Sequence, residues 1–403
     1  MNTLCIEAGV CETRGALKHK GRVREFFFAP ALGDEELGNE FLPGDVYLGR
    51  VRTVSSAING IFVDIGDRID GFLPLKKSHK AVTEGQQIIV GIHRDAIGDK
   101  GCVLTTAWKK GQSQDGVTMI EQKVASAAVP CRLSRTRNGI EQIMARASGV
   151  FDQIIVDNRF ALNAVRQWTK DEMPVEMVGD VFDQLEFEDL IEGALDRYVD
   201  LIGGGRLIID ETAGGCVIDV DAGSAAGRAT KLVNDKINSS AVTAISLALS
   251  RRAIGGRVFI DFLPPSTPDV RKKLLAALQA EFSYFQGGRV GKLLADGVVD
   301  ITMPKRSRSL LYRACEIAGD DWCRPGWQLS RSWAAKNAIH RLEAILRKSS
   351  TVRPHLYLHE ELMEILNVNP QWRERLGSRY GARFLIETSN SLKPRSFDLV
   401  ERG

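Results

Sequence analysis

The amino-acid sequence predicts an α/β protein built from several domains. With 403 residues the chain is too long for a single hydrophobic core, so roughly two to four domains are expected. Residues 45–106 contain short apolar segments separated by glycines, which is typical of a small β-barrel. Residues 217–262 contain an apolar segment, a helical pattern and a second apolar segment. This order predicts a βαβ unit whose two strands run parallel in one sheet.

The composition is that of an ordinary globular protein, with 44% hydrophobic and 26% charged residues. No apolar run reaches about eighteen residues, so no membrane segment is expected, and residues 1–5 lack the pattern of a secretion signal. The seven scattered cysteines predict buried thiols in a reducing cytoplasm. The net charge of +3 is uninformative about nucleic acid, so only the position of local basic clusters can indicate such a partner.

Hydrophobic periodicity predicts the elements before the βαβ unit. A strand pair comes first, with a turn near residues 18–21, and the barrel follows a polar stretch. Residues 107–150 are weakly patterned, with a helix expected near 118–128. The expected strands are 3–8, 23–28, 45–54, 58–65, 71–75, 87–93, 102–106, 131–133, 141–144 and 152–157, and the expected helices are 160–169 and 187–201.

The second half of the chain begins with a glycine run that opens a hairpin. Between the acidic strands a helix is expected over 229–253, and Gly255 ends it. The composition becomes loop-like after Gly319, which indicates a linker, and a basic helix over 334–348 opens a small C-terminal α/β module. The other expected elements are the strands 206–209, 215–221, 298–303 and 397–400 and the helix 269–285.

Three aspartates in the βαβ unit are the main candidates for chemistry. Asp219 and Asp221 lie in one apolar segment and Asp261 in the other, where a buried acid is costly unless it is compensated. Because side chains alternate along a strand, Asp219 and Asp221 point to the same face, and we expect all three carboxylates to converge at one edge. Three oxygen donors without a histidine or cysteine pattern suit Mg²⁺ or Mn²⁺ rather than zinc. Alternatively, one or two of them only cap a helix or brace a loop.

Aromatic side chains lie on adjacent strands of the expected barrel, among basic residues. They are Tyr47, Phe62 and Phe72. Exposed rings of this kind stack on the bases of single-stranded nucleic acid, at about 1–3 kcal/mol per base. The alternative is that Phe62 and Phe72 belong to the core of a small barrel.

The order of these motifs resembles a known family. Residues 49–54, 60–66 and 70–75 resemble the S1 RNA-binding domain, an oligonucleotide-binding barrel. Several later motifs appear in the order and spacing of the ribonuclease E/G family, so the resemblance covers nearly the whole chain. These motifs are residues 207–212, 218–221, 255–256 and 259–262, together with 12–17, 305–308 and, more weakly, 397–400.

The resemblance implies a domain layout. An RNase H-like domain without its own active site is interrupted by the S1 barrel and followed by a DNase I-like catalytic domain and a small C-terminal α/β module. The implied boundaries are 1–43 and 151–202 for the RNase H-like domain, 44–106 for the barrel, 107–150 for a reduced 5′ sensor or linker, 203–315 for the catalytic domain, 316–333 for a linker and 334–403 for the C-terminal module.

The resemblance also implies a site and a reaction. Asp219 and Asp261 match the metal-binding aspartates of the family, whereas Asp221 stands where the family usually has an asparagine and is expected to be able to bind metal directly. Metal-activated water should leave a 5′-phosphate and a 3′-hydroxyl, as the family does. None of the six histidines is paired with another, so a mechanism with two histidines is not supported.

Basic residues are expected to hold the RNA. Lys305, Arg306 and Arg308 follow the strand 298–303 and could clamp the substrate backbone near the metal, unless they form only a solvated turn. Lys100 matches a family lysine that lines the S1 channel.

Two departures from the family change what is expected. The family's zinc link uses a Cys-Pro-x-Cys pair from each of two subunits, but here Cys315 is followed only by Cys323, so we expect no zinc link and leave homo-oligomer formation open. Residues 107–150 are shorter than the family's 5′-monophosphate sensor, and 135–137 is the nearest counterpart of its binding pair. Cleavage should therefore depend little on the phosphorylation of the 5′ end.

These observations favour a Mg²⁺-dependent endoribonuclease that cuts single-stranded RNA in ribosomal RNA maturation or messenger turnover. The alternative is an RNA-binding or ribosome-assembly protein on the same scaffold with weak or no catalysis. The acidic strands favour the enzyme, because the alternative leaves them unexplained.

Overall fold

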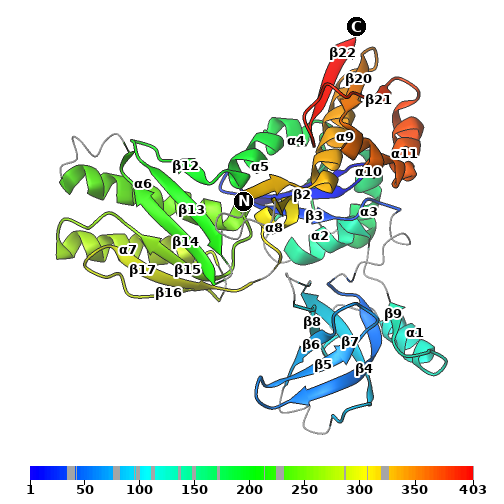
Figure 1. Cartoon of the computed structure of the whole chain (residues 1–403), viewed down its shortest axis with the longest axis horizontal. Helices are drawn as coiled ribbons and strands as arrows, with labels where there is room; N and C mark the ends of the chain where they lie inside the picture. Colours follow the sequence, from blue (N-terminus) through cyan, green and yellow to red (C-terminus); the bar gives the residue numbers. More distant parts are fainter. Residues whose placement is uncertain are drawn as a thin grey trace. The chain divides into compact units, whose positions relative to one another are not determined.

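The structure is a computed structural model (Figure 1). It describes residues 1–33, 41, 43–75, 82–94, 96, 100–109, 114–134, 138–147, 151–169, 173–212, 214–223, 231–285, 287–305, 307–318 and 326–402. Within these ranges, no helix has the length and apolar character needed to cross a membrane. The chain forms two compact units, one of Gly33–Asn138 and one of Met1–Leu32 with Gly139–Gly403. The architecture is mixed α/β with several sheets and one small closed barrel, which confirms the expected α/β fold class.

The first unit is the barrel. Its five expected strands are confirmed, and β4 closes the sheet because it pairs with β7 through its first half and with β5 through its second. The strand expected near residue 131 pairs with β4, so the weakly patterned segment belongs to this unit as far as Asn138. The elements are β4 (Val46–Ser55), β5 (Gly60–Asp64), β6 (Gly71–Pro74), β7 (Gln87–Arg94), β8 (Val103–Thr105), α1 (Gln114–Val124) and β9 (Cys131–Ser134).

The second unit begins with a five-stranded sheet of order β11-β10-β1-β2-β3. Chain segments on either side of the barrel therefore share one sheet. The sheet consists of β1 (Asn2–Ala8), β2 (Thr13–His19), β3 (Arg22–Ala29), β10 (Gln153–Val156) and β11 (Val175–Met177), with the helices α2 (Gly139–Ala147), α3 (Arg159–Thr169), α4 (Val181–Gln184) and α5 (Phe187–Leu195).

Three expectations about this sheet are wrong. β2 was not expected, because the polar and small residues Arg14 and Gly15 interrupt its apolar alternation. The strand expected over 141–144 is part of α2, whose buried residues Ile140, Ile143 and Met144 recur at helical spacing. The helix expected over 187–201 ends at Leu195, and the next residues form a short strand.

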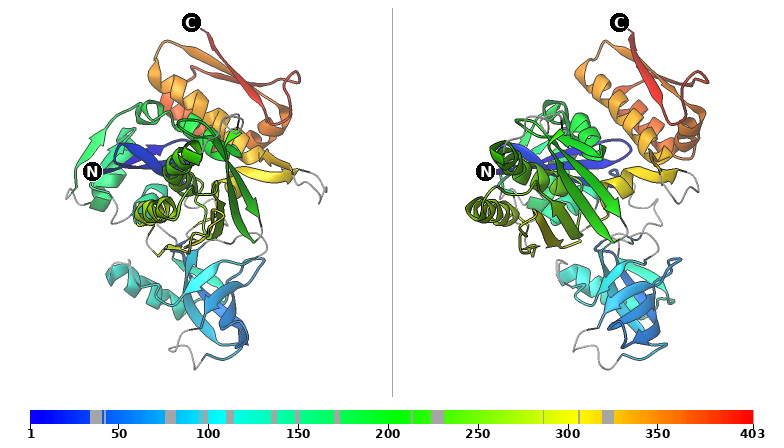
Figure 2. Two further views of the ribbon diagram at one scale, coloured as in Figure 1. Left: turned by 90° about the vertical axis from the view of Figure 1, so that its left-hand side faces the viewer. Right: turned by 60° about the vertical axis from the view of Figure 1, so that its left-hand side comes forward.

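A six-stranded sheet contains the acidic βαβ unit. Its order is β12-β13-β14-β15-β17-β16, and β14 and β15 are parallel neighbours, as predicted. The long helices α6 and α7 lie on the same side of the sheet (Figure 2) and pack on its apolar face. The elements are β12 (Tyr198–Asp200), β13 (Arg206–Thr212), β14 (Gly215–Asp221), α6 (Lys231–Arg251), β15 (Gly256–Asp261), α7 (Pro268–Phe282), β16 (Arg289–Val290) and β17 (Val298–Met303).

The acidic strands are buried on one face only, whereas their apolar segments predicted buried strands. Ile218 and Ile260 face the helices and are inaccessible to solvent. The alternate residues Asp219 and Asp261 face the other side, where they are exposed. The aspartates therefore need no buried partner to be tolerated.

The chain ends in a small α/β module. In the region expected as a linker, the described residues on either side of 319–325 pair as strands, β18 with β19. The expected basic helix and terminal strand are confirmed as α9 and β22. The elements are α8 (Leu310–Ala314), β18 (Cys315–Ala318), β19 (Gly326–Leu329), α9 (Arg331–Lys348), β20 (Arg353–Leu358), α10 (Glu360–Asn367), α11 (Pro370–Tyr380), β21 (Leu385–Thr388) and β22 (Phe397–Arg402).

Buried charges join this module to the first sheet. Glu7 on β1 is 2% exposed and accepts hydrogen bonds from Arg14 at 2.6 Å and from Arg347 of α9 at 2.7 Å. Burial alone would raise the pKa of Glu7, but the two guanidinium groups hold it well below its ordinary range. The backbone N–H of Val10 donates to Glu343 of α9 at 3.0 Å. The first strands and the C-terminal module thus share one polar network.

Candidate active site

Two carboxylates lie side by side at one end of the six-stranded sheet. Asp219 on β14 is the register partner of Asp261 on β15. Neighbouring strands lie about 4.8 Å apart, so the two side chains project from adjacent positions of the open face. The expected meeting of Asp219 and Asp261 at one end of parallel strands is confirmed, and their role as metal ligands stays a prediction.

The charge of this pair suits a divalent cation. Burial raises the pKa of Asp219, and the carboxylates of Asp261 and Asp221 raise it further. A cation held by Asp219 and Asp261 would offset this repulsion. Mg²⁺ commonly binds proteins through one or two carboxylates and takes its other ligands from water and substrate phosphate. The donor set therefore fits Mg²⁺, and Mn²⁺ accepts the same ligands.

Asp221 is held in a different arrangement. Its side chain forms an ion pair with Arg206 of β13 at 3.0 Å and accepts a hydrogen bond from the N–H of Gly223 at 2.9 Å. That N–H lowers the pKa of Asp221, and Arg206 lowers it too. Among the described residues, no three acidic, histidine or cysteine side chains form a group that could hold a metal ion. The expected convergence of three carboxylates is therefore wrong, because Arg206 engages the third.

Arg206 was not identified from the sequence. It is the register partner of Asp221, and its guanidinium also lies over the ring of Tyr198, 4.8 Å from the centroid. The signal was present, because a basic residue opens the strand that pairs antiparallel with the acidic one. Predicting that Arg206 meets Asp221 requires the register of the hairpin, which is a property of the fold.

Side chains of α6 fix the backbone just after Asp261. The amide of Asn238, 1% exposed, donates to the carbonyl of Leu263 at 2.7 Å and accepts from its N–H at 3.1 Å. Asp235, one helical turn earlier, accepts hydrogen bonds from the N–H and hydroxyl of Ser266. These positions were also missed, although a polar residue inside the apolar stripe of a helix is itself a signal.

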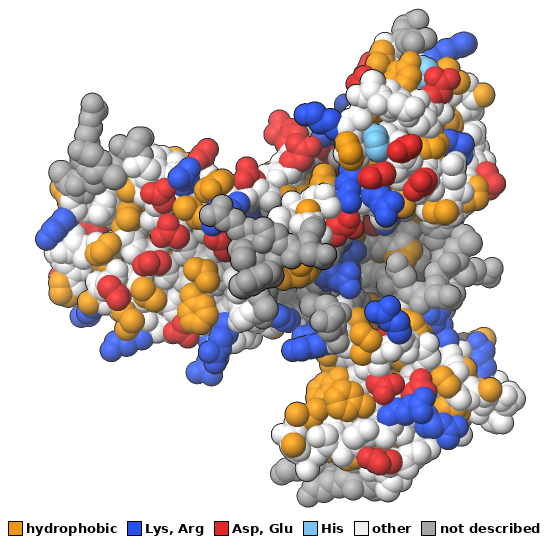
Figure 3. Space-filling view, in the orientation of Figure 1, with side chains coloured by type: hydrophobic (Ala, Val, Ile, Leu, Met, Phe, Trp, Pro, Cys, Tyr) orange, Lys and Arg blue, Asp and Glu red, His pale blue; other side chains and the backbone are white. Residues whose placement is uncertain are grey.

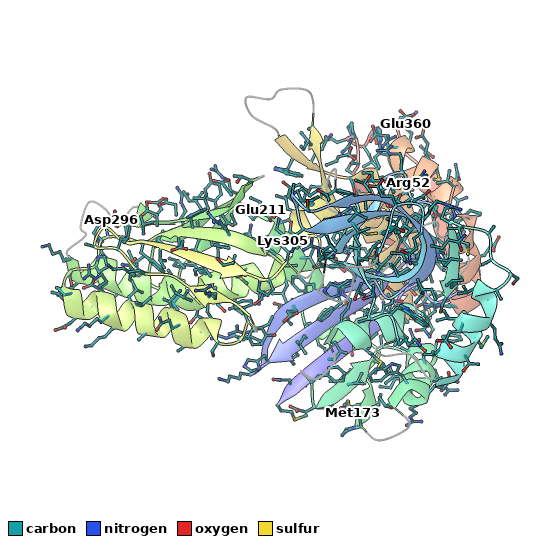
Figure 4. All side chains as sticks on the ribbon, turned by 90° about the horizontal axis from the view of Figure 1, so that it is seen from below. Arg52, Met173, Glu211, Asp296, Lys305 and Glu360 are labelled. Atoms are coloured by element: carbon teal, nitrogen blue, oxygen red, sulfur yellow. The ribbon has the colours of Figure 1, made fainter. Side chains whose placement is uncertain are left out.

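The basic segment after β17 does not lie beside the carboxylate pair. β17 runs antiparallel to β15, so Asp261 pairs with Val298 at its start and Gly256 pairs with Met303 at its end. Lys305 follows that end and approaches Gly256. Figure 4 labels Asp296 and Lys305, just before and just after β17, at opposite ends of the sheet. β17 alone spans roughly 17 Å, so the expected clamp near the metal is wrong for Lys305.

Lys305 instead lies near Glu211, which is labelled beside it in Figure 4. Burial raises the pKa of Glu211, and Ser309, Arg252 and Lys305 oppose that rise. Arg308 is exposed, and Arg306 lies outside the described residues. An RNA-binding role for Lys305, Arg306 and Arg308 stays a prediction, and for Lys305 it would lie at a distance from the carboxylate pair.

The barrel exposes two of its three candidate rings. Phe62 and Phe72 are partly exposed neighbours on β5 and β6, with centroids 5.7 Å apart. Gly60 leaves room for this pair, because a Cβ there would lie 2.0 Å from Cε2 of Phe72. Tyr47 is 2% exposed and belongs to the barrel core, so its expected role in stacking is wrong. Lys100 is exposed. It lies two residues before Cys102, whose carbonyl accepts a hydrogen bond from the N–H of Phe72.

The expected absence of the family's zinc link and the expected reduction of its 5′ sensor both remain predictions. Cys315, half-buried, begins β18, whereas Cys323 lies outside the described residues. Residues 135–137, the nearest counterpart of the sensor pair, lie outside them as well.

The Ribonuclease E/G family model matches residues 104–302 of the chain. Ribonuclease G of Escherichia coli is 24% identical over 410 residues, an alignment that covers 77% of this chain and 81% of that protein. Ribonuclease G of Haemophilus influenzae is 24% identical over 400 residues, with coverages of 76% and 80%. Ribonuclease E of a Nostoc species is 24% identical over 371 residues, with coverages of 69% and 52%. On these similarities, the chain belongs to the ribonuclease E/G family.

Proposed function

We propose that this chain is a metal-dependent endoribonuclease that hydrolyses phosphodiester bonds in single-stranded RNA. The observation that carries the proposal is the register pairing of Asp219 with Asp261 on the open face of a sheet. Its relatives are named ribonucleases G and E, which makes RNA the substrate to test. The protein would act in the cytoplasm, in ribosomal RNA maturation or messenger turnover.

Asp219 and Asp261 would hold Mg²⁺, or Mn²⁺ in its place. A bound Mg²⁺ supplies a Lewis acid for a phosphoryl oxygen and lowers the pKa of a bound water. Attack by water would leave a 5′-phosphate and a 3′-hydroxyl. Asn238 positions the backbone that follows Asp261, through its two hydrogen bonds to Leu263.

The partly exposed Phe62 and Phe72 support RNA binding by the barrel, because neighbouring rings on adjacent strands offer stacking surfaces to two bases. Lys100 would contact a phosphate beside them. The five-stranded and six-stranded sheets would correspond to the RNase H-like and DNase I-like domains of the family. Any homo-oligomer would have to form without the family's zinc link.

The test is cleavage of a short, end-labelled, A/U-rich single-stranded RNA with Mg²⁺, beside EDTA and the Asp261→Asn variant. We expect internal cuts that require the metal and disappear in the variant. Binding without cleavage would contradict the proposal and leave an RNA-binding or ribosome-assembly protein on this scaffold.

A further inference from the structure

The open face of the six-stranded sheet carries different kinds of side chain in successive rows across its strands. Rows are two residues apart along each strand, which is about 6.6 Å. The first row is acidic, the second apolar and the third basic. They contain Asp219 and Asp261, then Val217 and Phe259, then Arg257 and Arg289, the last two aligned through their common partner Thr302.

The apolar row is exposed in the middle of a sheet. Phe259 is 39% exposed and Val217 is 45% exposed, although their neighbours Val258 and Ile218 are fully buried against the helices. In Figure 3, hydrophobic and acidic side chains lie side by side on the part of the molecule that carries this sheet. A phenylalanine ring left accessible beside a candidate reaction centre is a surface for a ligand with an apolar face.

The basic row lies on the side of Phe259 away from the carboxylates. Arg257 and Arg289 are both exposed. Within the described ranges, neither has an ion pair with an acidic side chain. Their charge is therefore available to an anion that reaches this row.

A carboxylate borders the apolar row on each side. Asp210 on β13 is the register partner of Val217 and forms an ion pair with Arg197. Asp300 on β17 is the register partner of Phe259 and is exposed. It repels a phosphate from the second row, while its oxygens can accept hydrogen bonds from the amino group of a base. The second row therefore suits a base, and the third row suits a phosphate further along the strand.

We propose that this face is the path of the RNA strand beside the cleaved bond, with a base next to the scissile phosphate stacked on Phe259 and a phosphate further along the strand bound by Arg257 and Arg289. This inference rests on the proposed function and adds a binding subsite to it.

The rows favour RNA over a second copy of the chain as occupant of this face. An acidic, an apolar and a basic row in succession suit a metal-bound phosphate, a stacked base and a further phosphate of a single strand. The acidic row would repel the phosphates unless a cation occupied it, which is the arrangement that the proposed chemistry requires.

Binding is measured first, with RNA that carries 2-aminopurine at the nucleotide beside the mapped cleavage site. The protein carries Asp219→Asn so that the RNA stays intact. Stacking on Phe259 should quench the fluorescence, and Phe259→Ala in this background should abolish the quenching and lower affinity about 5- to 150-fold, which corresponds to one stacked base. Phe259→Trp should preserve both. The matched control is Phe160→Ala, because Phe160 is a phenylalanine that is 62% exposed on α3, outside this sheet.

The arginines and the reaction supply independent readouts. Arg257→Gln should reduce the slope of log affinity against log salt concentration by about 0.7, the value for one phosphate contact on a single strand. In the active protein, Phe259→Ala should lower kcat/KM, and Phe259→Trp should restore it.

If the parent cleaves RNA, an unchanged kcat/KM and undiminished quenching in Phe259→Ala would overturn the inference and leave the proposed function intact. If the parent cuts no RNA, the proposed function fails, and 2-aminopurine placed in turn at each internal position of the same RNA would still report whether a base reaches Phe259. A change of oligomeric state in Phe259→Ala without a change in RNA affinity would assign the face to a second copy.

Discussion

Replacing Arg206 by glutamine removes one charge beside the carboxylate pair and leaves Asp221 without its ion-pair partner. Asp221 lies two residues from Asp219 on the same face, about 7 Å away by strand geometry. One unit charge at that distance contributes about 0.6 kcal/mol in water and about 2.4 kcal/mol at an effective dielectric constant of about 20. The side chains of Arg206 and Asp221 are 45% and 32% exposed, so the lower part of this range applies.

The uncompensated charge of Asp221 should weaken the binding of RNA and strengthen the binding of Mg²⁺. In Arg206→Gln we expect weaker RNA binding, about 3- to 10-fold in KM, and a lower Mg²⁺ concentration for half-maximal activity. Asp221→Asn should keep activity, because an asparagine oxygen can still accept the hydrogen bond from Gly223. The double variant should return both quantities toward the parent values, since it removes both charges.

The assay is the initial rate of cleavage, measured against RNA at saturating Mg²⁺ and against Mg²⁺ at saturating RNA. Two results would refute the reasoning. If the double variant is as impaired as Arg206→Gln, Arg206 acts on the RNA directly and not through Asp221. If Asp221→Asn is as inactive as Asp261→Asn, Asp221 is itself a metal ligand.

Other predictions concern stability, pH and the barrel. Glu7→Ala should lower the free energy of unfolding by about 3–5 kcal/mol in chemical denaturation, because it leaves buried guanidinium groups without their shared partner. Burial and the neighbouring Glu7 raise the pKa of Asp157 to about 7. The folded protein therefore binds more protons than the unfolded chain between about pH 4 and pH 7, and stability should fall as pH rises through this window. Thermal melting should show a flatter pH profile in Asp157→Asn, and an equal slope in both proteins would contradict the assignment. Gly60→Ala should displace the ring of Phe72 and weaken binding of single-stranded RNA, whereas an unchanged affinity would exclude this ring from the interface. RNAs with a 5′-monophosphate and a 5′-triphosphate should be cleaved at similar rates, and a strong preference for the monophosphate would show that the sensor is retained.

Local periodicity predicted much of the fold. All five barrel strands, the parallel neighbours β14 and β15, and the helix between them follow from patterns within a few residues. The alternation that places Asp219 and Asp261 on one face is also local, so their meeting could be predicted once the βαβ unit was recognised. Whether that face is covered by helices depends on distant parts of the chain, which is why the exposure of the aspartates could not be predicted.

The missed features all depend on pairing partners far apart or on strand direction. The contact of Arg206 with Asp221 needs the hairpin register, and the distance of Lys305 from Asp261 needs the antiparallel direction of β17. The burial of Tyr47 needs the closure of the barrel, because its ring lies on the inner side of β4 only after the sheet curls. A sequence pattern shows which side chains share a face of one strand, but not what lies opposite that face.

The hydrogen bond between the N–H of Val10 and Glu343 joins residues 333 positions apart. A ribosome adds about 5–20 residues per second, so roughly 15 to 70 seconds separate the synthesis of these two partners. During that interval Glu7 and Arg14 have already been made, but Arg347 of α9 has not. The first strands of the protein therefore reach their final electrostatic environment only when nearly the whole chain has been translated. Until then, Glu7 and Val10 lack the partners that α9 supplies.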